Sequence, residues 1–470
     1  MDSHLEKVSR IQKELEKAFK QKSQVSFLRK TTNSTRNKVG QKTHPVDISD
    51  LDQILCLNTE KLVITVEPDV SMDVLVAYTL EHNLIPAVVP EFPGITVGGA
   101  VQGGALESSS FKFGQFNDSC ISFEVLLVDG TLVVATLDNE SADLFWGMST
   151  SYGTLGLLTQ VSLKLVPAQA FVDLTIKTYP DYQTCIDAIL KETRTNVDFV
   201  ESILLGQSKA VSIVGKLSKQ PSYKVQRFSR NIDPWYWRFV RDATVDKEKV
   251  RISVPVTDYL FRQDKGAFWM GEYLFPIFSL PSTRFTRFLF APFMRTRKLY
   301  DGLHALRMQQ EFVIQDIFMD IEDIDTVLQC NQEQLEIYPI WLCPIKASTE
   351  QQKLSSHFRE RQQMLLNVGI YGLSKYENAV SATKRLEQFV AGTRTGRKML
   401  YSQTFYTKDE LWAQYDKTFF DTLRTKYRAN DLKSWDEKLL VNQDGIRPQK
   451  WKGIWQMLLE TLAGKNVVWW

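Results

Sequence analysis

The pattern of apolar and polar positions predicts an amphipathic helix at the amino terminus. Apolar side chains recur at helical spacing at Leu5, Val8, Ile11, Leu15 and Phe19. On the opposite face, Glu6 and Arg10 form one of two oppositely charged pairs four residues apart, a spacing that stabilises helices. We expect residues 1–21 to form this helix and to pack onto the domain that follows.

Short apolar runs separated by turn residues predict an α+β domain over residues 22–168. Its first part, residues 22–43, is polar and basic, which is typical of a strand followed by a mobile loop. Residues 124–136, EVLLVDGTLVVAT, alternate as two strands around Asp129 and Gly130, a dipeptide that favours a type I′ hairpin turn.

Longer helices and more aromatic residues predict a second α+β domain over residues 169–400. FVDLTIKTYP and IYPIWLCPI have the apolar pattern of strands, whereas YQTCIDAILKETRT and SATKRLEQFVAGT have that of helices. The remaining residues, 401–470, are rich in tryptophan and in helix-forming sequence. We expect them to form a helical segment that returns to the first domain.

Composition excludes several classes of protein. The 470 residues are 43% hydrophobic and 24% charged, as in ordinary globular chains, and the net charge of +2 does not favour a nucleic acid partner. The five cysteines are widely separated, so we expect reduced thiols and no metal site. The amino terminus lacks the apolar core of a signal peptide, and no apolar run reaches about 18 residues. We therefore expect a cytoplasmic protein, soluble or peripheral to a membrane, without a transmembrane helix.

The segment PEFPGITVGGAVQGGALESSSFKFGQF, residues 90–116, carries the clearest chemical signal. It is crowded with glycines at 98, 99, 103 and 104 and with serines at 108–110. Glycines let a backbone approach a ligand closely, and free N–H groups and hydroxyls can hold a pyrophosphate or a flavin. The alternative is a glycine-rich turn without a ligand. No Rossmann or P-loop spacing is present.

The order of these blocks resembles the FAD-binding domain of the vanillyl-alcohol oxidase (PCMH) type, and within that superfamily the Δ24-sterol reductases. The likeness rests on TVGGAVQGGALESSSFKFG, VIQD, YPIWLCP, GIYG and MLYSQTFYTKDELW, which follow one another in the family's order. It implies an α+β fold with a two-part FAD-binding domain, a second α+β substrate (cap) domain and a helical carboxy-terminal segment.

The resemblance implies that FAD is bound by the glycine-rich segment and by the later turn SYGTLG. The implied cofactor-binding residues are Gly98, Gly99, Gly103, Gly104, Ala105, Leu106, Glu107, Ser108, Ser109, Ser110, Phe111, Lys112, Phe113, Gly114, Gln115, Phe116, Gly153, Thr154 and Gly156. The histidines lie outside the glycine-rich segment, which predicts non-covalent FAD.

This sequence departs from the family pattern in two places. The loop RKTTNSTRNKVG, which in the family holds pyrophosphate with several glycines, has only Gly40. The apolar leader that anchors animal and plant members is absent, so membrane attachment, if any, must come from elsewhere.

A reductase of this kind would pass electrons from NADPH through FAD to an isolated side-chain double bond of a sterol or related isoprenoid lipid. Such an alkene has no carbonyl to polarise it, so the site needs an acid, an apolar slot and aromatic residues around it. The candidate acids are Glu107, Asp316, Tyr371 and Tyr406. Each has a structural alternative, as a surface carboxylate or a bonded core tyrosine.

Three cations are candidate partners of these acids. Lys112 lies in the glycine-rich segment, and Arg262 and Lys265 lie in YLFRQDKGAFW. The last two would bind the NADPH phosphate or the substrate, or else form salt bridges.

Residues 268–300 combine ten aromatic side chains with five Arg or Lys and one Glu. This composition is typical either of a domain core with a basic edge or of a surface that meets a membrane and admits a lipid substrate. Two other functions remain open. One is an alcohol or sugar oxidase or dehydrogenase of the same fold, and the other is a flavin-fold scaffold without turnover.

Overall fold

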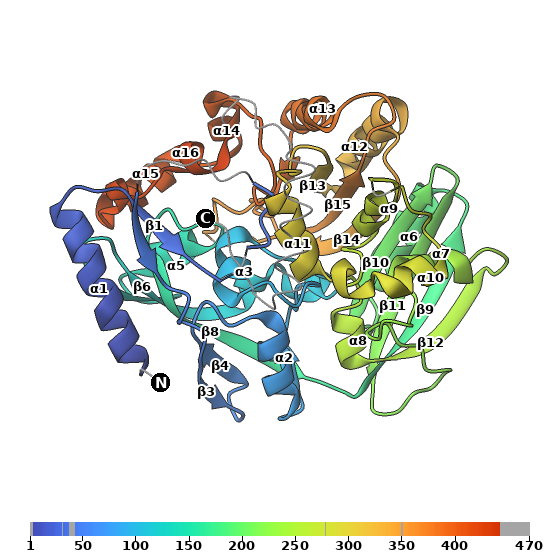
Figure 1. The fold of residues 1–470 in the computed structure, drawn as a ribbon, viewed down its shortest axis with the longest axis horizontal. Coiled ribbons are helices and arrows are strands. Elements are labelled where there is room, and N and C mark those ends of the chain that lie inside the picture. Colours follow the sequence, from blue (N-terminus) through green and yellow to red (C-terminus); the bar gives the residue numbers. More distant parts are fainter. Residues whose placement is uncertain (1–2, 31, 37–42, 278, 349–350, 442–470) are drawn as a thin grey trace.

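Two β-sheets, each covered by its own helices, form the two halves of the molecule in this computed structural model (Figure 1). The structure describes residues 3–30, 32–36, 43–277, 279–348 and 351–441. In Figure 1 the six-stranded sheet lies on the left and the eight-stranded sheet on the right. The chain passes from the first sheet to the second between Pro167 and Phe171. The expected α+β fold class is confirmed.

The first sheet has the strand order β3-β4-β8-β6-β7, with β5 on β8, and every pairing in it is antiparallel. Its strands are β3 (Ile54–Asn58), β4 (Val63–Val66), β5 (Leu84–Pro86), β6 (Cys120–Leu126), β7 (Leu132–Thr136) and β8 (Leu157–Pro167). The helices of this half are α2 (Met72–Leu80), α3 (Val97–Gly103), α4 (Ser110–Phe113), η1 (Phe116–Ser119) and α5 (Ala142–Met148).

The predicted amino-terminal helix is confirmed as α1 (His4–Lys20). It begins at Ser3, which forms a capping box with Glu6. Val8, Ile11, Leu15 and Ala18 are buried against the first half, whereas Leu5 is 73% exposed. The apolar face that packs is therefore narrower than the sequence pattern indicated.

A two-stranded parallel sheet follows α1. The predicted strand in residues 22–43 is β1 (Val25–Leu28), and it pairs with β2 (His44–Asp47). The mobile loop expected after that strand falls largely on residues 37–42, which lie outside the described residues.

The predicted β6–β7 hairpin is present, but its turn is not of type I′. The strands pair from Leu126 with Leu132, which leaves residues 127–131 as the connection. Gly130 has φ +88°, whereas Asp129 is absent from the described residues with positive φ, and a type I′ turn requires both. The reason is a longer turn closed by the Leu127 amide, which donates to the carbonyl of Thr131.

The second sheet has the order β12-β9-β11-β10-β14-β15-β13-β16 and is antiparallel throughout. Its strands are β9 (Phe171–Tyr179), β10 (Phe199–Gly206), β11 (Lys209–Ser218), β12 (Lys249–Pro255), β13 (Val313–Asp320), β14 (Ile340–Lys346), β15 (Met364–Gly372) and β16 (Arg397–Lys398). The two strands predicted in this half correspond to β9 and β14.

Helices and short turns cover this second sheet. They are α6 (Tyr182–Glu192), α7 (Tyr236–Ala243), α8 (Val256–Leu260), η2 (Met270–Tyr273), α9 (Leu274–Ile277), α10 (Arg284–Leu289), η3 (Ala291–Met294), α11 (Thr296–Ala305), η4 (Ile321–Asp323), α12 (Ile324–Cys330), η5 (Asn331–Leu335) and α13 (Ala379–Gly392). The two predicted helices correspond to α6 and α13.

The carboxy-terminal segment returns to the first half of the molecule. It contains α14 (Lys408–Gln414), α15 (Lys417–Lys426), η6 (Ala429–Asp431) and α16 (Trp435–Leu439). Leu411, Phe420 and Trp435 are buried in the same core as the first sheet. Residues 442–470 of the predicted segment lie outside the described residues. Within the described part of the chain, the helices are all too short or too polar to cross a bilayer.

Candidate functional site

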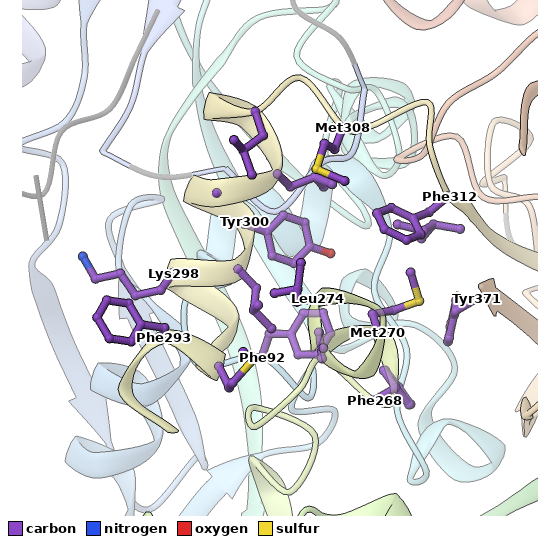
Figure 2. Close-up of a pocket in the computed structure, with 18 of the residues that line it drawn as sticks. Phe92, Phe268, Met270, Leu274, Phe293, Lys298, Tyr300, Met308, Phe312 and Tyr371 are labelled. Carbon is purple, nitrogen blue, oxygen red and sulfur yellow. The ribbon is translucent and has the colours of Figure 1, made fainter. Parts of the chain in front are cut away.

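The second half of the molecule contains an apolar cavity of ≈ 410 Å³ (Figure 2). Helices α9 and α11, with η2 and η3, line one side, and β13 and β15 contribute Ile314 and Tyr371. The aromatic and thioether side chains that line it include Phe92, Phe268, Met270, Phe290, Phe293, Met294, Tyr300, Met308 and Phe312. Phe293 and Lys298 are half-exposed at one end, whereas Phe268 and Tyr371 are buried.

Polar groups of the cavity gather around the buried carboxylate of Asp316. The hydroxyls of Tyr371 and Tyr401, which both line the cavity, donate to its two oxygens at 2.7 Å each. The Asn367 amide donates to Oδ1 at 2.7 Å. Burial raises the pKa of Asp316, while these three hydrogen bonds act in the opposite direction. Two sequence-predicted residues, Asp316 and Tyr371, are thus brought together here.

Glu91 is a second carboxyl at the cavity, and the sequence analysis did not select it. It follows β5 in the loop that leads to α3, and its neighbour Phe92 packs edge-on against Phe268 with ring centroids 5.9 Å apart. Burial raises the pKa of Glu91 to about 8, and repulsion from Glu107 adds to this effect. Glu91 is therefore a protonated acid at neutral pH.

A second, much smaller hollow, in the first half of the molecule, is lined by one cation and lies beside two others. Arg29, Asp69, Gly98 and Gly99 line it. Next to it, Nζ of Lys438 lies 3.3 Å, and Nη2 of Arg29 3.7 Å, from the point where a Cβ on Gly153 would stand.

The cations at and beside this hollow are not fully balanced by nearby negative charge. Burial lowers the pKa of Arg36 to about 10 and lowers that of Lys438 well below its usual range, and repulsion from Arg29 contributes to both. The carboxyl of Asp69 lies close to Arg29, but burial raises its pKa to about 7, so it compensates only in part. One guanidinium nitrogen of Arg36 is buried without a hydrogen-bond partner.

These features fit the pyrophosphate of a dinucleotide cofactor. Three adjacent cations and the open backbone of Gly103, whose Cβ position has no atom within 4 Å, offer both charge and close approach. The side-chain amide of Gln115 is also buried without a partner. When bound, FAD would supply hydride chemistry here, and Arg29, Arg36 and Lys438 would hold its phosphates. Arg29 and Arg36, both from the segment that has a single glycine in the sequence, would thus supply charge in place of backbone groups.

The glycine-rich segment is held mainly by its own side chains. Ser109 Oγ donates to the carbonyl of Ala87 at 2.8 Å, Ser110 Oγ accepts from the Glu107 amide at 2.9 Å, and Ser108 Oγ donates to the Glu107 carboxylate. These hydroxyls therefore stabilise the segment itself, which leaves its backbone and the glycines as the groups available to a ligand. Cofactor contact by residues 104–116 stays a prediction.

Three other predicted cofactor-binding residues have internal roles. A Cβ on Gly98 would lie 2.7 Å from Pro68 Cβ, and one on Gly156 2.7 Å from Val125 Cγ1, so both glycines permit close packing. Thr154 Oγ1 donates to the carbonyl of Ser151 at 2.7 Å. Gly153, by contrast, lies beside the cationic hollow.

Glu107 and Arg262 form a buried ion pair away from the cavity. Arg262 Nη2 lies 2.6 Å from Glu107 Oε1 and 2.9 Å from Glu201 Oε2. Of the two alternatives for Arg262, the structure therefore shows the salt bridge. Ser108 and Tyr259 complete the surroundings, and neither carboxylate lines the cavity. Glu107 is accordingly not placed to act on a substrate there.

Three remaining candidates also lie elsewhere. Lys265 Nζ donates to the carbonyls of Arg230 and Asp233 at 2.7 Å, and burial lowers its pKa to about 8. Tyr406 is buried in the core of the first half, and Lys112 pairs with Asp198 at 3.0 Å. None of the three lines the cavity.

Metal chemistry receives no support from the described side chains. Throughout that part of the chain, His, Cys, Asp and Glu form no group of three that could hold a metal ion.

Comparison with known proteins defines the class and then the family. Residues 4–136 match the family model of an FAD binding domain, and with the cationic hollow this defines an FAD-dependent oxidoreductase. The chain is 30% identical to the Δ24-sterol reductase of Pisum sativum over 421 residues, covering 82% of this chain and 74% of that protein. It is 28% identical to the Homo sapiens Δ24-sterol reductase over 440 residues, covering 91% and 84%. The chain belongs to the Δ24-sterol reductase family.

One similarity is to a protein of different named activity. The decaprenylphosphoryl-β-D-ribose oxidase of Mycolicibacterium smegmatis is 26% identical over 124 residues, which is 26% of this chain and 27% of that protein.

The sequence analysis missed several residues of both hollows. Glu91 stood in the quoted PEFPG run, Tyr401 in the quoted MLYSQTFYTKDELW block, and Arg36 in the loop noted only for its missing glycines. Glu91 could have been selected because it is a charged residue within an otherwise apolar run. Nothing in the sequence connects Lys438 with a loop four hundred residues earlier.

Proposed function

We propose that this chain uses FAD to reduce an isolated side-chain double bond of a sterol or related isoprenoid lipid, with NADPH as electron donor. The observation that carries the proposal is the cavity. Its ≈ 410 Å³ lies within the range of about 300–1,000 Å³ that small-molecule sites occupy, and nearly all its lining is apolar. A neutral lipid fits this lining, whereas a sugar would leave its hydroxyls without partners.

The polar groups of the cavity suit protonation of an alkene. A carbon that accepts a proton leaves positive charge on its neighbour, which aromatic faces stabilise. Phe268 and Tyr371 supply such faces, with ring centroids 5.2 Å apart. Asp316, held by Tyr371 and Tyr401, orients the two hydroxyls that face the cavity.

We further propose that the lipid enters from a membrane surface at α10. No residue of α10 is buried, and Phe285, Phe288 and Leu289 are 71%, 52% and 56% exposed. Phe290 and Phe293, which follow directly, line the cavity. Arg284 has no ion-pair partner among the described residues and is available to anionic headgroups. The exposed apolar surface thus continues into the cavity.

Anaerobic spectroscopy of the purified protein tests the reaction. We expect a flavin spectrum that NADPH bleaches and that desmosterol, which has a Δ24 bond, restores. Cholesterol, which lacks that bond, is the control and should restore nothing. A flavin that NADPH leaves oxidised but an alcohol or sugar reduces would replace the proposal with an oxidase or dehydrogenase. Absence of flavin after reconstitution with FAD would exclude both enzymes.

A further inference from the structure

The loop that follows β5 brings one carboxyl from the first half of the molecule to the cavity. Glu91 and Phe92 both line the cavity, whose other residues come almost entirely from residues 267–314. Phe92 fixes the position of this loop, because its ring packs against Phe268 and against Tyr300, with centroids 5.9 and 6.0 Å away. The Glu91 carboxyl is therefore held beside the space that a substrate would occupy.

No cation among the described residues forms an ion pair with Glu91, although Lys298 lines the same cavity. The two carboxyl groups whose charge raises the pKa of Glu91 are those of Glu107 and Asp316. The positive charge of Arg262 lowers the pKa of Glu91, but Glu107 and Glu201 already bind that guanidinium at 2.6 and 2.9 Å. A carboxyl in an apolar cavity without a counter-ion keeps its proton.

The other hydroxyls at the cavity are poorer proton donors. Tyr371 and Tyr401 already donate to Asp316, and burial raises their pKa values well above the usual range. Burial also raises the pKa of Tyr300 well above the usual range. Burial raises the pKa of the Glu91 carboxyl only to about 8, so among these four groups it is the one that gives up a proton most readily.

We propose that Glu91 is the catalytic acid that protonates the alkene, an inference that rests on the proposed function. The Glu91 O–H bond breaks, and its proton forms a C–H bond with the π electrons at the less substituted alkene carbon. The more substituted carbon, left positive, would then take a hydride, which bound FAD, once reduced by NADPH, would supply. The Glu91 carboxylate then regains a proton from water, so that the alkane formed contains one solvent proton and one hydride.

Glu91→Gln tests the proposal because it preserves shape and removes the proton. We expect NADPH to reduce the flavin of the variant at the wild-type rate. Reoxidation by desmosterol should be at least about 100-fold slower, since general acid catalysis contributes on the order of 10²–10⁴-fold. Glu81→Gln, an exposed carboxylate that follows α2, is the matched control and should behave as wild type.

The pH dependence of both steps gives an independent readout. Reoxidation by desmosterol should be constant at low pH and should fall as pH rises through about 8, where Glu91 loses its proton. Binding of desmosterol to flavin-free protein should weaken over the same range, because a carboxylate would then face the lipid. Glu91→Gln should abolish both dependences. Glu91→Asp, which retains an acid, should keep a measurable, pH-dependent reoxidation.

The outcomes separate the two proposals. Wild-type reoxidation by Glu91→Gln would overturn the role of Glu91 and leave sterol reduction intact. A wild-type flavin that desmosterol does not reoxidise would instead overturn the proposed function. A variant that lost FAD reduction by NADPH as well as reoxidation would also contradict the proposal, because the acid acts only on the alkene.

Discussion

The cationic hollow around Arg36 and the apolar cavity around Glu91 differ in what each requires of a ligand. Arg29, Arg36 and Lys438 lie at or beside the first, and the described carboxyl that lines it with Arg29 is that of Asp69, which is partly protonated. The second holds a carboxyl, that of Glu91, which keeps its proton because burial favours the neutral form and no described cation forms an ion pair with it. In the hollow, burial disfavours the charged form of the cations, which an anionic ligand would stabilise. In the cavity, burial favours the neutral form of the carboxyl, which suits a neutral lipid.

The same physical effect thus prepares two sites for opposite ligands. Desolvation lowers the pKa of Arg36 and Lys438 and raises that of Glu91. A dinucleotide brings negative charge to the first group, and an alkene accepts the proton of the second. Charge moved into either site should therefore affect only the ligand of that site.

A charge placed in the cavity should have the largest effect. Leu274→Asp puts a carboxylate among the apolar lining labelled in Figure 2, and burial of an unpaired charge costs several kcal/mol, so we expect desmosterol binding to weaken by about 100-fold or more. The FAD content should not change. Equilibrium binding of desmosterol and the flavin absorbance of the same preparation measure the two effects.

The neutral variant Leu274→Asn separates charge from shape. It should weaken desmosterol binding much less than Leu274→Asp does. Equal losses in the two variants would show that packing, not charge, determines what the cavity accepts. Loss of FAD from Leu274→Asp would show that the two sites are not independent.

Removal of a cation from the hollow should have the next largest effect. Arg36→Gln and Lys438→Gln should each weaken FAD binding by about tenfold or more, because a hydrogen bond to a charged group contributes roughly 1.5–3 kcal/mol. Desmosterol binding to the flavin-free protein should stay unchanged. Titration of flavin-free protein with FAD, followed by fluorescence, measures this affinity at several salt concentrations.

Lys30→Gln is the matched control for this hollow. Lys30 follows Arg29 directly, but its ammonium pairs with Asp52 at 2.5 Å in an exposed position. FAD affinity should hardly change in this variant. Unaltered FAD binding in Arg36→Gln and Lys438→Gln would mean that the cations serve the fold rather than the cofactor.

The two sites also differ in how far the sequence predicted them. The fold class, α1 and strands β9 and β14 followed from local periodicity, because each buries one apolar face in a regular element. The glycine-rich segment was also found from a local pattern, its concentration of glycines and serines. The turn at Gly130 was mispredicted because a longer loop competed with the two-residue turn.

Contacts between distant segments were beyond local patterns. Lys438 reaches the hollow only because α16 packs on the first half, and Glu91 reaches the cavity only because residues 267–314 fold over its loop. Glu107 was selected for its place in the glycine-rich segment, yet Arg262 and Glu201 bind it from the second half. Such partners depend on tertiary packing, which spacing does not encode.

The two ligands should also reach their sites by different routes. Substitutions in α10, which would change only the route of the sterol, should have the smallest effect. FAD is soluble, whereas a sterol must leave a membrane. Replacement of Phe285, Phe288 and Leu289 by serine removes exposed apolar side chains from α10 without touching buried core. We expect severalfold less protein to sediment with anionic lipid vesicles, because such binding scales with the apolar area inserted.

A matched variant and two ways of presenting the substrate make this test specific to α10. Serine at Leu132, Val134 and Leu137 removes three comparably exposed apolar side chains from β7 and the residue after it, and should leave vesicle binding unchanged. The α10 variant should reduce desmosterol more slowly when it is presented in vesicles, but at the wild-type rate when detergent delivers it. Slower reduction in both cases would show that α10 affects the reaction in the cavity and not only the delivery of the substrate. Unchanged vesicle binding, with a change in self-association instead, would mean that α10 meets a second copy of the chain.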